Sequence, residues 1–392
     1  MTSVEQPSAP GASSARGPNE ALIGEPGSRH QLSTPALVLD LDVMESNIGV
    51  MAARANEKGY KLRPVAKIHK SVEIARRQIA AGGIGMCCST IAECELMVEG
   101  KIPGVMLFTP VIAEEKLARL AALNAQAEDL VVAADSVAVV ERYADVARRS
   151  GKSLQVLVDL EVGGRRTGAL EEGALNLAQI VSETDGLDYV GLQGYVGSHQ
   201  HTSDYEQRRA RSERLLEPLR RVLDRLVSAG LTPRIVSGGG TGTHDFDHDV
   251  GLFTEIQVGS YVFMDVNYRD VVLRTDDPHP FGPALSVRTT VISAAKPDFV
   301  VTDAGIKEID AIFGIDRPMI LRGAPMEAQY SLVGDDMGRI ELPDAQEALP
   351  IGSVIEVQPP HCYQTAILHP CYHAVRGDVL EDIWPVGARA NW

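Results

Sequence analysis

The sequence predicts an α/β fold, in which a (β/α)8 barrel is followed by a β-rich C-terminal domain. Two observations carry this prediction. Between about residues 60 and 258, eight apolar strand-like runs alternate with segments of helical periodicity. After about residue 275, helical periodicity is nearly absent and short strand-like runs lie between turns. Alternation of strands and helices is typical of a parallel barrel, whereas short strands joined by turns indicate a separate β domain.

The chain begins with a segment that shows no apolar period. Residues 1–33 are rich in Ser, Pro, Gly and Ala, so we expect a mostly disordered tail. The run at 36–41 reads as a strand, and Asp42 with Glu45 reads as a capping box at the start of a helix. Eight further strands follow, so the 36–41 strand is one too many for the barrel. We expect it to pair with the C-terminal domain instead.

The eight predicted barrel strands share an apolar, strand-like character. They lie near 60–67, 84–88, 104–108, 129–133, 154–160, 188–195, 233–237 and 255–258. Helical patterns fill most of the intervals, for example at 72–81, 114–123 and 204–229. The last interval is short for a full helix, so this unit is expected to be irregular. We place the barrel domain at 34–274.

The C-terminal domain is predicted at 275–392. Its expected strands lie at 287–294, 299–302, 319–321, 353–357 and 366–368.

Composition and charge exclude several classes of protein. The 392-residue chain carries a formal net charge of −16, which repels phosphates and argues against a nucleic-acid partner. No stretch approaches 18 consecutive apolar residues, so no membrane-spanning segment is expected. The five cysteines include no CxxC pair, and the N-terminus lacks a basic and then apolar signal. We therefore expect a cytoplasmic protein without a disulfide framework.

Two motifs at predicted strand ends point to a cofactor. Lys67 lies in the run RPVAKIHK at 63–70, at the end of the first barrel strand, and GGGTGT at 238–243 follows the seventh. Active-site groups gather at the C-terminal ends of barrel strands, and the first and seventh strands are near neighbours in a closed barrel. Glycines let backbone N–H groups approach a phosphate, and Lys67 supplies an amine that can condense with an aldehyde. An amine beside a phosphate cradle predicts pyridoxal 5'-phosphate (PLP) as the cofactor.

Several ordered motifs resemble one enzyme family. They include TPALVLD at 34–40, the lysine run, GGRRTG at 163–168, QGYVGSHQH at 193–201, the GGGTGT loop, EIQVGSYVFMD at 255–265 and WPV at 384–386. Through them the chain resembles the D-threonine aldolase, 3-hydroxy-D-aspartate aldolase and D-serine dehydratase family of fold-type III PLP enzymes. That resemblance implies a barrel of the alanine racemase type, a small amino acid as substrate and a homodimer.

The resemblance also implies roles for particular residues. Lys67 would be the lysine that binds PLP covalently, and His201 would handle the proton of a substrate hydroxyl. The remaining cofactor-binding residues that it implies are Arg166, Tyr195, Gly239, Gly240, Thr241, Gln257, Gly259 and Tyr261. An exposed position near the start of a helix is the plainer interpretation of His201. Arg63, Arg165, Arg269 and Lys307 are candidates to bind the substrate carboxylate, or are surface charges.

Two positions depart from the family pattern. Val65 stands where relatives usually have histidine, which removes a hydrogen-bonding group beside the lysine. Relatives carry Pro-x-His-x-(Asp or Cys), which holds a divalent metal, whereas this chain has His361 followed two residues later by Tyr363. A neutral tyrosine is a poor metal ligand because its hydroxyl stays protonated at pH 7. The metal is therefore left open, with His361 as its first ligand and Cys362, His369 or His373 as further candidates.

Three functions remain open from the sequence. The first is retro-aldol cleavage of a D-3-hydroxy amino acid to glycine and an aldehyde, with Lys67, His201, His361 and Tyr363 as the catalytic residues. The second is another PLP reaction on a D-amino acid, such as dehydration, racemisation or a biosynthetic aldol or transfer step without a metal. The third is a PLP carrier without catalytic activity. The sequence leaves open the aldehyde, the stereochemistry at the β-carbon and the direction of the reaction.

Overall fold

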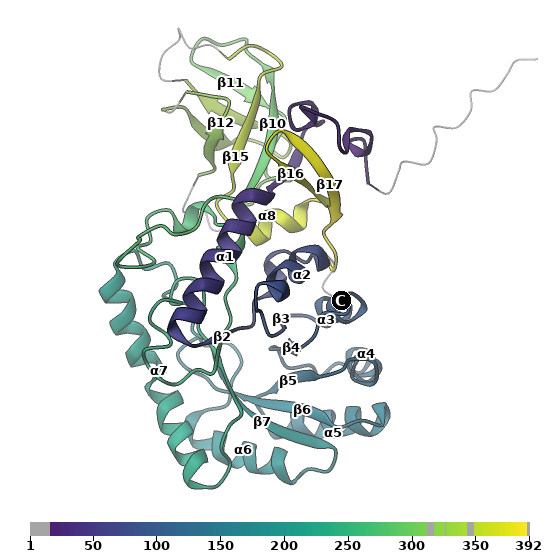
Figure 1. Cartoon of the computed structure of the whole chain (residues 1–392), viewed down its shortest axis with the longest axis vertical. Helices are drawn as coiled ribbons and strands as arrows, with labels where there is room; N and C mark the ends of the chain where they lie inside the picture. The colour runs from purple at the N-terminus through teal and green to yellow at the C-terminus, as the bar shows by residue number, and fades with distance from the viewer. Residues whose placement is uncertain (1–15, 312–316, 326, 343–348, 390–392) are drawn as a thin grey trace, which may run out of the picture.

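The computed structural model describes residues 16–311, 317–325, 327–342 and 349–389 of the chain. Figure 1 shows a barrel in the lower part of the view and a β domain above it. Buried side chains of both parts belong to one continuous hydrophobic cluster, which includes Leu37, Val158 and Tyr330.

The barrel contains all eight predicted strands in one parallel sheet. They are β2 (Lys61–Leu62), β3 (Met86–Cys88), β4 (Val105–Leu107), β5 (Leu130–Ala134), β6 (Leu154–Asp159), β7 (Leu187–Gly194), β8 (Ile235–Gly238) and β9 (Glu255–Ile256). Their order is β2-β9-β8-β7-β6-β5-β4-β3, and a bridge between Val65 and Cys87 joins the two ends of this series. The first and last strands in space are thus held together, and the barrel is closed.

Helices separate most of the strands, as the sequence predicts. They are α1 (Leu41–Lys58), α2 (Val72–Ala80), α3 (Ile91–Glu99), α4 (Glu114–Gln126), α5 (Val137–Ser150), α6 (Glu171–Glu183) and α7 (Tyr205–Ser228). Turns and no helix lie between β8 and β9, so the irregular last unit is confirmed. No helix among the described residues is long and apolar enough to cross a membrane.

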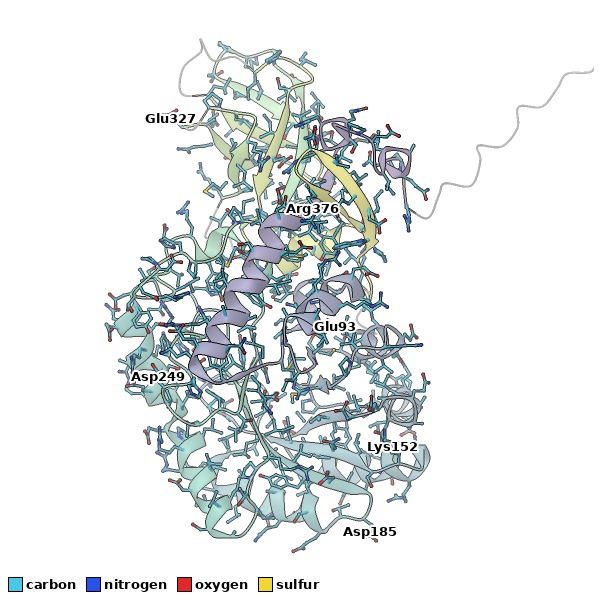
Figure 2. The ribbon with its side chains drawn as sticks, viewed as in Figure 1. Glu93, Lys152, Asp185, Asp249, Glu327 and Arg376 are labelled. Carbon is cyan, nitrogen blue, oxygen red and sulfur yellow. The ribbon has the colours of Figure 1, made fainter. Side chains whose placement is uncertain are left out.

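The start of α1 differs from the prediction. Asp40, and not Asp42, is its N-cap, because the Asp40 side chain accepts a hydrogen bond from the backbone N–H of Val43. The expected capping box is therefore wrong. Asp42 and Glu45 instead form ion pairs with Arg376 of the C-terminal domain, and Figure 2 labels this arginine.

The C-terminal domain is built around a nine-stranded mixed sheet. Its strands are β1 (Ala36–Asp40), β10 (Leu285–Ser293), β11 (Phe299–Thr302), β12 (Met319–Arg322), β13 (Gln329–Leu332), β14 (Gly338–Glu341), β15 (Val354–Gln358), β16 (Cys371–Arg376) and β17 (Val379–Pro385). Strand β1 is antiparallel to β10 and parallel to β16, so the N-terminal strand lies inside this sheet. The predicted strand at 366–368 is wrong, because these residues end helix α8 (Cys362–Leu368).

The expected disordered tail is corrected for residues 16–33; residues 1–15 lie outside the described part of the chain. Two 3-10 turns, η1 (Glu20–Leu22) and η2 (Ser28–Gln31), pack against the C-terminal sheet. Arg29 in η2 is buried and forms ion pairs with Glu356 and Asp40. A buried charge stays ordered when it has such partners, whereas local composition suggests disorder.

Candidate active site

A cavity of about 190 Å³ opens at the C-terminal ends of the barrel strands. Lys67 lies just beyond β2, Tyr195 follows β7, and Gly240 and Thr241 follow β8. Helix α8 of the C-terminal domain closes one side with His361 and Tyr363. The structure therefore brings the lysine run and the glycine loop to one cavity, as the barrel topology predicts.

Lys67 lies in a single 3-10 turn, η3 (Ala66–Ile68), and not at the end of a strand as predicted, because β2 ends at Leu62 and only an isolated bridge at Val65 continues the pairing. The pKa of the Lys67 amine is lowered, first by burial and then by the positive charges of Arg166 and Lys70. A lower pKa increases the fraction of neutral amine, the form that attacks an aldehyde. The Lys67 Nζ lies 5.2 Å from the centre of the Tyr363 ring.

The loop after β8 has the geometry of a phosphate cradle. Gly239 adopts a positive φ of 67°, which favours glycine, and a Cβ at Gly240 would lie 2.7 Å from Oε1 of Gln200. The backbone N–H groups of Gly259 and Tyr261 both point at the hydroxyl of Thr241, at 3.2 Å. Backbone donors thus converge on the mouth of this loop, an arrangement that suits an anion.

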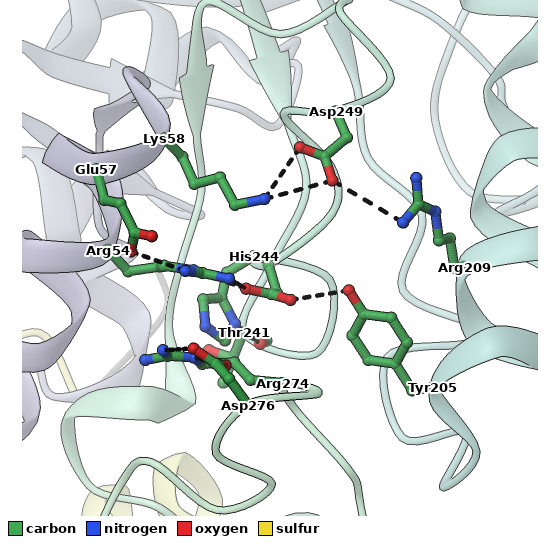
Figure 3. Close-up of polar contacts among 11 residues, drawn as sticks. Arg54, Glu57, Lys58, Tyr205, Arg209, Thr241, His244, Asp249, Arg274 and Asp276 are labelled. Carbon is green, nitrogen blue, oxygen red and sulfur yellow. Dashed lines mark hydrogen bonds and ion pairs between the residues drawn. The ribbon is translucent and has the colours of Figure 1, made fainter.

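Ion pairs and hydrogen bonds fix the segment behind the cradle to the helices on both sides. Asp245 pairs with Arg54 of α1 and accepts a hydrogen bond from the hydroxyl of Tyr205 on α7. Nδ1 of His244 lies 2.7 Å from the carbonyl oxygen of Thr241. Figure 3 shows these contacts beside the Lys58, Asp249 and Arg209 group. The cradle is therefore held rigidly before any anion arrives.

Arg208 of α7 links this loop to neighbouring segments of the chain by hydrogen bonds. Its fully buried guanidinium donates hydrogen bonds to the backbone carbonyls of Gly242, Thr202 and Val272. Burial lowers its pKa. Asp247 beside it accepts hydrogen bonds from Thr243 and Ser212, and burial raises the pKa of Asp247 to about 7.

One group of lining residues is flat and polar. The Arg166 guanidinium lies 5.1 Å from the centre of the Tyr195 ring. The Gln257 amide donates hydrogen bonds to Gln193 Oε1 and to the Ser237 hydroxyl. These residues form a wall on which an aromatic cofactor ring can rest.

A second group of lining residues carries imidazole and phenol rings. The rings of His361 and Tyr363 meet edge to face, with centres 4.2 Å apart, and His201 lies 4.4 Å from Tyr268. Burial, with smaller contributions from His201 and Lys67, lowers the pKa of His361 to about 4. Burial raises the pKa of Tyr363. His361 is therefore a neutral imidazole at pH 7 and can accept a proton.

Some predicted site residues lie elsewhere. Tyr261 does not line the cavity, because its hydroxyl is buried and accepts a hydrogen bond from Gln78. Only its backbone reaches Thr241, and Gly239 likewise lies beneath the lining, beside Asp247. His201 is exposed and lies before Asp204, the N-cap of α7, yet it lines the cavity. His201 is therefore both exposed to solvent and part of the cavity lining.

The four residues predicted as candidates to bind the substrate carboxylate do not line the cavity. Arg63 is buried against Glu255, while Arg269 pairs with Asp270 and Lys307 with Asp336 at the surface. Arg165 is exposed and lies outside the cavity lining. Arg166 and Lys67 are the lysine and arginine residues that line the cavity among the described residues.

Lining residues that the sequence reasoning did not single out include Ile68, Phe108, Gln193, Gln200, Ser260 and Tyr268. Phe108 has a positional signal, because it ends the run predicted at 104–108. Gln193 and Gln200 lie within the QGYVGSHQH motif. Tyr268 gave no signal, since it reaches the cavity from a 3-10 turn, η5 (Val266–Tyr268), beyond the last barrel strand.

Replacing Gly240 with alanine is expected to weaken PLP binding at least about tenfold, because the new methyl group displaces Gln200 and narrows the cradle. Titration of the apoprotein with PLP measures the effect. Gly173→Ala on α6, where a Cβ has open space, is the matched control and should leave the affinity unchanged. Equal affinities for the two variants would contradict the phosphate assignment.

A lysine beside an anion cradle, at the mouth of an eight-stranded parallel barrel with a separate β domain, defines the class of alanine racemase-like enzymes. The family described as "Alanine racemase, N-terminal domain" matches residues 39–267, and "Putative serine dehydratase domain" matches residues 284–375. The chain therefore belongs to the alanine racemase-like family that includes the D-threonine and 3-hydroxy-D-aspartate aldolases.

Named relatives cover nearly the whole chain. The 3-hydroxy-D-aspartate aldolase of Paracoccus denitrificans is 32% identical over 366 residues, which are 92% of this chain and 93% of the relative. The D-threonine aldolase of an Arthrobacter species is 35% identical over 373 residues, or 95% and 96% of the two chains. The crystal structure of D-threonine aldolase from Filomicrobium marinum is similar with a TM-score of 0.86 and 34% identity, covering 91% of this chain and 96% of that one.

The residues present fit PLP, the cofactor of this family. Lys67 supplies a buried amine with a lowered pKa, and Gly240 supplies the close approach that a phosphate needs. Thr241, Gly259 and Tyr195 also line the cavity and would complete the contacts with the phosphate and the ring.

The residue two positions after His361 differs from the metal ligand that the family resemblance implies. Tyr363 stands at the second ligand position, and burial raises its pKa further, so its hydroxyl stays protonated. Asp265, His361 and Cys362 have ligand atoms within 4.8 Å of one another. Asp265 and Cys362 lie outside the cavity lining, and Oδ2 of Asp265 accepts the backbone N–H of Cys362.

The other candidate ligands also lie elsewhere. Nε2 of His369 faces the carbonyl of Glu308, and Nδ1 of His373 faces that of Leu37. Cys362 begins helix α8. No step of the reaction is assigned to a metal ion.

Proposed function

We propose that this chain is a PLP-dependent aldolase that cleaves the Cα–Cβ bond of a D-3-hydroxy amino acid to glycine and an aldehyde. The observation that carries the proposal is the single cavity in which Lys67 and the glycine loop face His361 and Tyr363. Relatives that are 32% and 35% identical are named for this chemistry and support it.

The residues that line the cavity take different parts of the reaction. PLP, when bound, would accept the electron pair of the bond broken at Cα. Lys67 would hold the cofactor covalently, and Gly240 and Thr241 would hold its phosphate. His361, which is neutral, or alternatively His201, takes the proton of the β-hydroxyl as the Cα–Cβ bond breaks and that oxygen becomes the aldehyde carbonyl.

Tyr363 is assigned to the substrate hydroxyl in place of a metal. Its ring lies over Lys67 and against His361, so its protonated hydroxyl can donate a hydrogen bond at this side of the cavity. One of the two imidazoles accepts the proton, and Tyr363 holds the oxygen in place.

Incubation with D-threonine, D-serine and D-3-hydroxyaspartate, each with and without a chelator, tests this function. Glycine and an aldehyde are expected, with equal rates in both conditions. Ammonia and a keto acid would instead make the chain a dehydratase, and the D-threo-3-hydroxyaspartate dehydratase of Delftia, 28% identical, is the observation that favours this second candidate. No product from any of the three would favour a PLP carrier.

Replacing Tyr363 with aspartate restores the ligand spacing of relatives and is expected to make the enzyme bind a divalent ion and respond to a chelator. Elemental analysis and turnover with added Mn²⁺ or Zn²⁺ measure this change. Tyr363→Phe is the matched control and should lower turnover by about 10²-fold without metal binding. Unaltered protein that purifies with a stoichiometric divalent ion, and loses activity with it, would contradict the assignment.

A homodimer is part of the proposal. Three large apolar side chains are exposed on the barrel rim that carries the cavity: Ile112 before α4, Val137 at the start of α5 and Leu170 before α6. The C-terminal domain exposes Ile306, Val333 and Met337. Two such surfaces can cover each other in a symmetric pair. Sedimentation analysis tests the assembly, and a monomer at working concentrations would contradict it.

The finer assignments of compartment and domain limits are proposals as well. All five cysteines are free, which supports a reducing cytoplasm. The change from barrel to C-terminal strands supports a boundary near residue 274, with β1 assigned to the second domain.

A further inference from the structure

Lys70 has a constrained conformation and lies close to the cofactor lysine. It follows Lys67 by three residues and adopts a positive φ of 47°, which is uncommon for a residue with a side chain. Its side chain is buried, yet it lies outside the cavity lining. The strained backbone is maintained by the contacts around it.

The Lys70 amine has two partners. It forms an ion pair with Glu93 of α3 and donates a hydrogen bond to the carbonyl of Ala388 at 3.1 Å. Glu93 is only 1% exposed and also accepts hydrogen bonds from the backbone and hydroxyl of Ser89. Figure 2 labels Glu93 below α2. The ion pair and these hydrogen bonds compensate for the removal of the Glu93 carboxylate from water.

The segment near the C-terminus binds the backbone of the same loop. Gly387 N–H donates to the carbonyl of Lys70 at 2.8 Å, and the Tyr372 hydroxyl donates to the carbonyl of His69 at 2.6 Å. Arg389 donates to the carbonyl of Ile367 in α8. This segment thus links the loop that carries Lys67 to the helix that carries Tyr363.

We propose that Lys70 is a positioning residue, which together with Glu93 and the segment 386–389 fixes Lys67 relative to α8. Lys70 touches neither the cavity nor its contents and acts through the main chain between itself and Lys67. The expected effect on kcat rests on the proposed function. The expected effect on the rate and strength of PLP binding by Lys67 does not depend on which reaction is catalysed.

The two charges also act on Lys67 with opposite signs. Lys70 lowers and Glu93 raises the pKa of the Lys67 amine, while burial and Arg166 act on it independently. Removing either partner is therefore expected to move this pKa in the direction set by the sign of the charge that is removed.

The test uses full-length Lys70→Met, Glu93→Gln and the double variant, together with a chain that ends at Val386. The readouts are the rate at which apoprotein turns yellow with PLP, the pH at which this colour changes, and kcat with whichever of D-threonine, D-serine and D-3-hydroxyaspartate the unaltered enzyme converts. Lys152→Met is the matched control, because that amine also binds backbone carbonyls, of Ala127 and Glu128, but far from the cavity. Leu177→Ala, which truncates a buried side chain of α6, is the control for a general loss of folding stability.

Lys70→Met and the shortened chain are expected to load PLP on the order of tenfold more slowly and to lose kcat by a similar factor. The colour change should shift to higher pH in Lys70→Met, to lower pH in Glu93→Gln, and return toward the original in the double variant. Loading rates and colour changes equal to those of the two controls would overturn the proposal. Because loading needs no substrate, that result is distinguishable from a failure of the aldolase assignment.

Discussion

Replacing Lys67 with alanine is expected to abolish covalent PLP binding and to lower turnover by at least about 10³-fold. Among the described residues, Lys67 supplies the lysine amine that lines the cavity, so no neighbouring lysine can replace it there. Reduction with borohydride followed by mass measurement detects the covalent adduct, and product formation gives the turnover.

The matched control is Lys58→Ala. It removes a surface amine of α1 that forms an ion pair with Asp249. It should keep both the adduct and the activity. A Lys67→Ala protein that still gains the mass of reduced PLP would show that another amine binds the cofactor, and the whole site assignment would then fail.

Replacing His361 with alanine is expected to reduce kcat by about 10²- to 10⁴-fold, the usual contribution of a general base. His361 is neutral at pH 7 because its pKa is about 4, so the loss is one of a proton acceptor and not of a charge. Steady-state kinetics of His361→Ala, His201→Ala and the double variant divide the proton transfer between the two imidazoles.

His279→Ala, in an exposed loop, controls for nonspecific effects of losing an imidazole. If His201 and His361 act in turn on the same proton, the double variant should lose less than the product of the two single losses. Full turnover in both single variants would end the assignment of these residues as bases.

The convergence of Lys67 and the glycine loop could be predicted because parallel topology places the ends of β2 and β8 at one rim. That inference needed only the strand positions, and all eight were found in the sequence. The assignment of His361 and Tyr363 came from the resemblance. Their placement depends on α8, which packs against the barrel from another domain.

The errors have a common physical origin in long-range partners. Glu45 resembles part of a capping box until Arg376, 331 residues away, is seen to bind it. Residues 16–33 have a composition typical of disorder, but Arg29 meets Glu356 in the folded protein. The apolar run at 366–368 is too short for its period to separate strand from helix.

The place of β1 between β10 and β16 has a consequence for synthesis on the ribosome. This N-terminal strand emerges first, yet both of its neighbours are made only after the whole barrel. It therefore lacks both neighbouring strands until some 240 further residues have been translated. We expect a chaperone that shields exposed strand edges to bind this strand in the nascent chain.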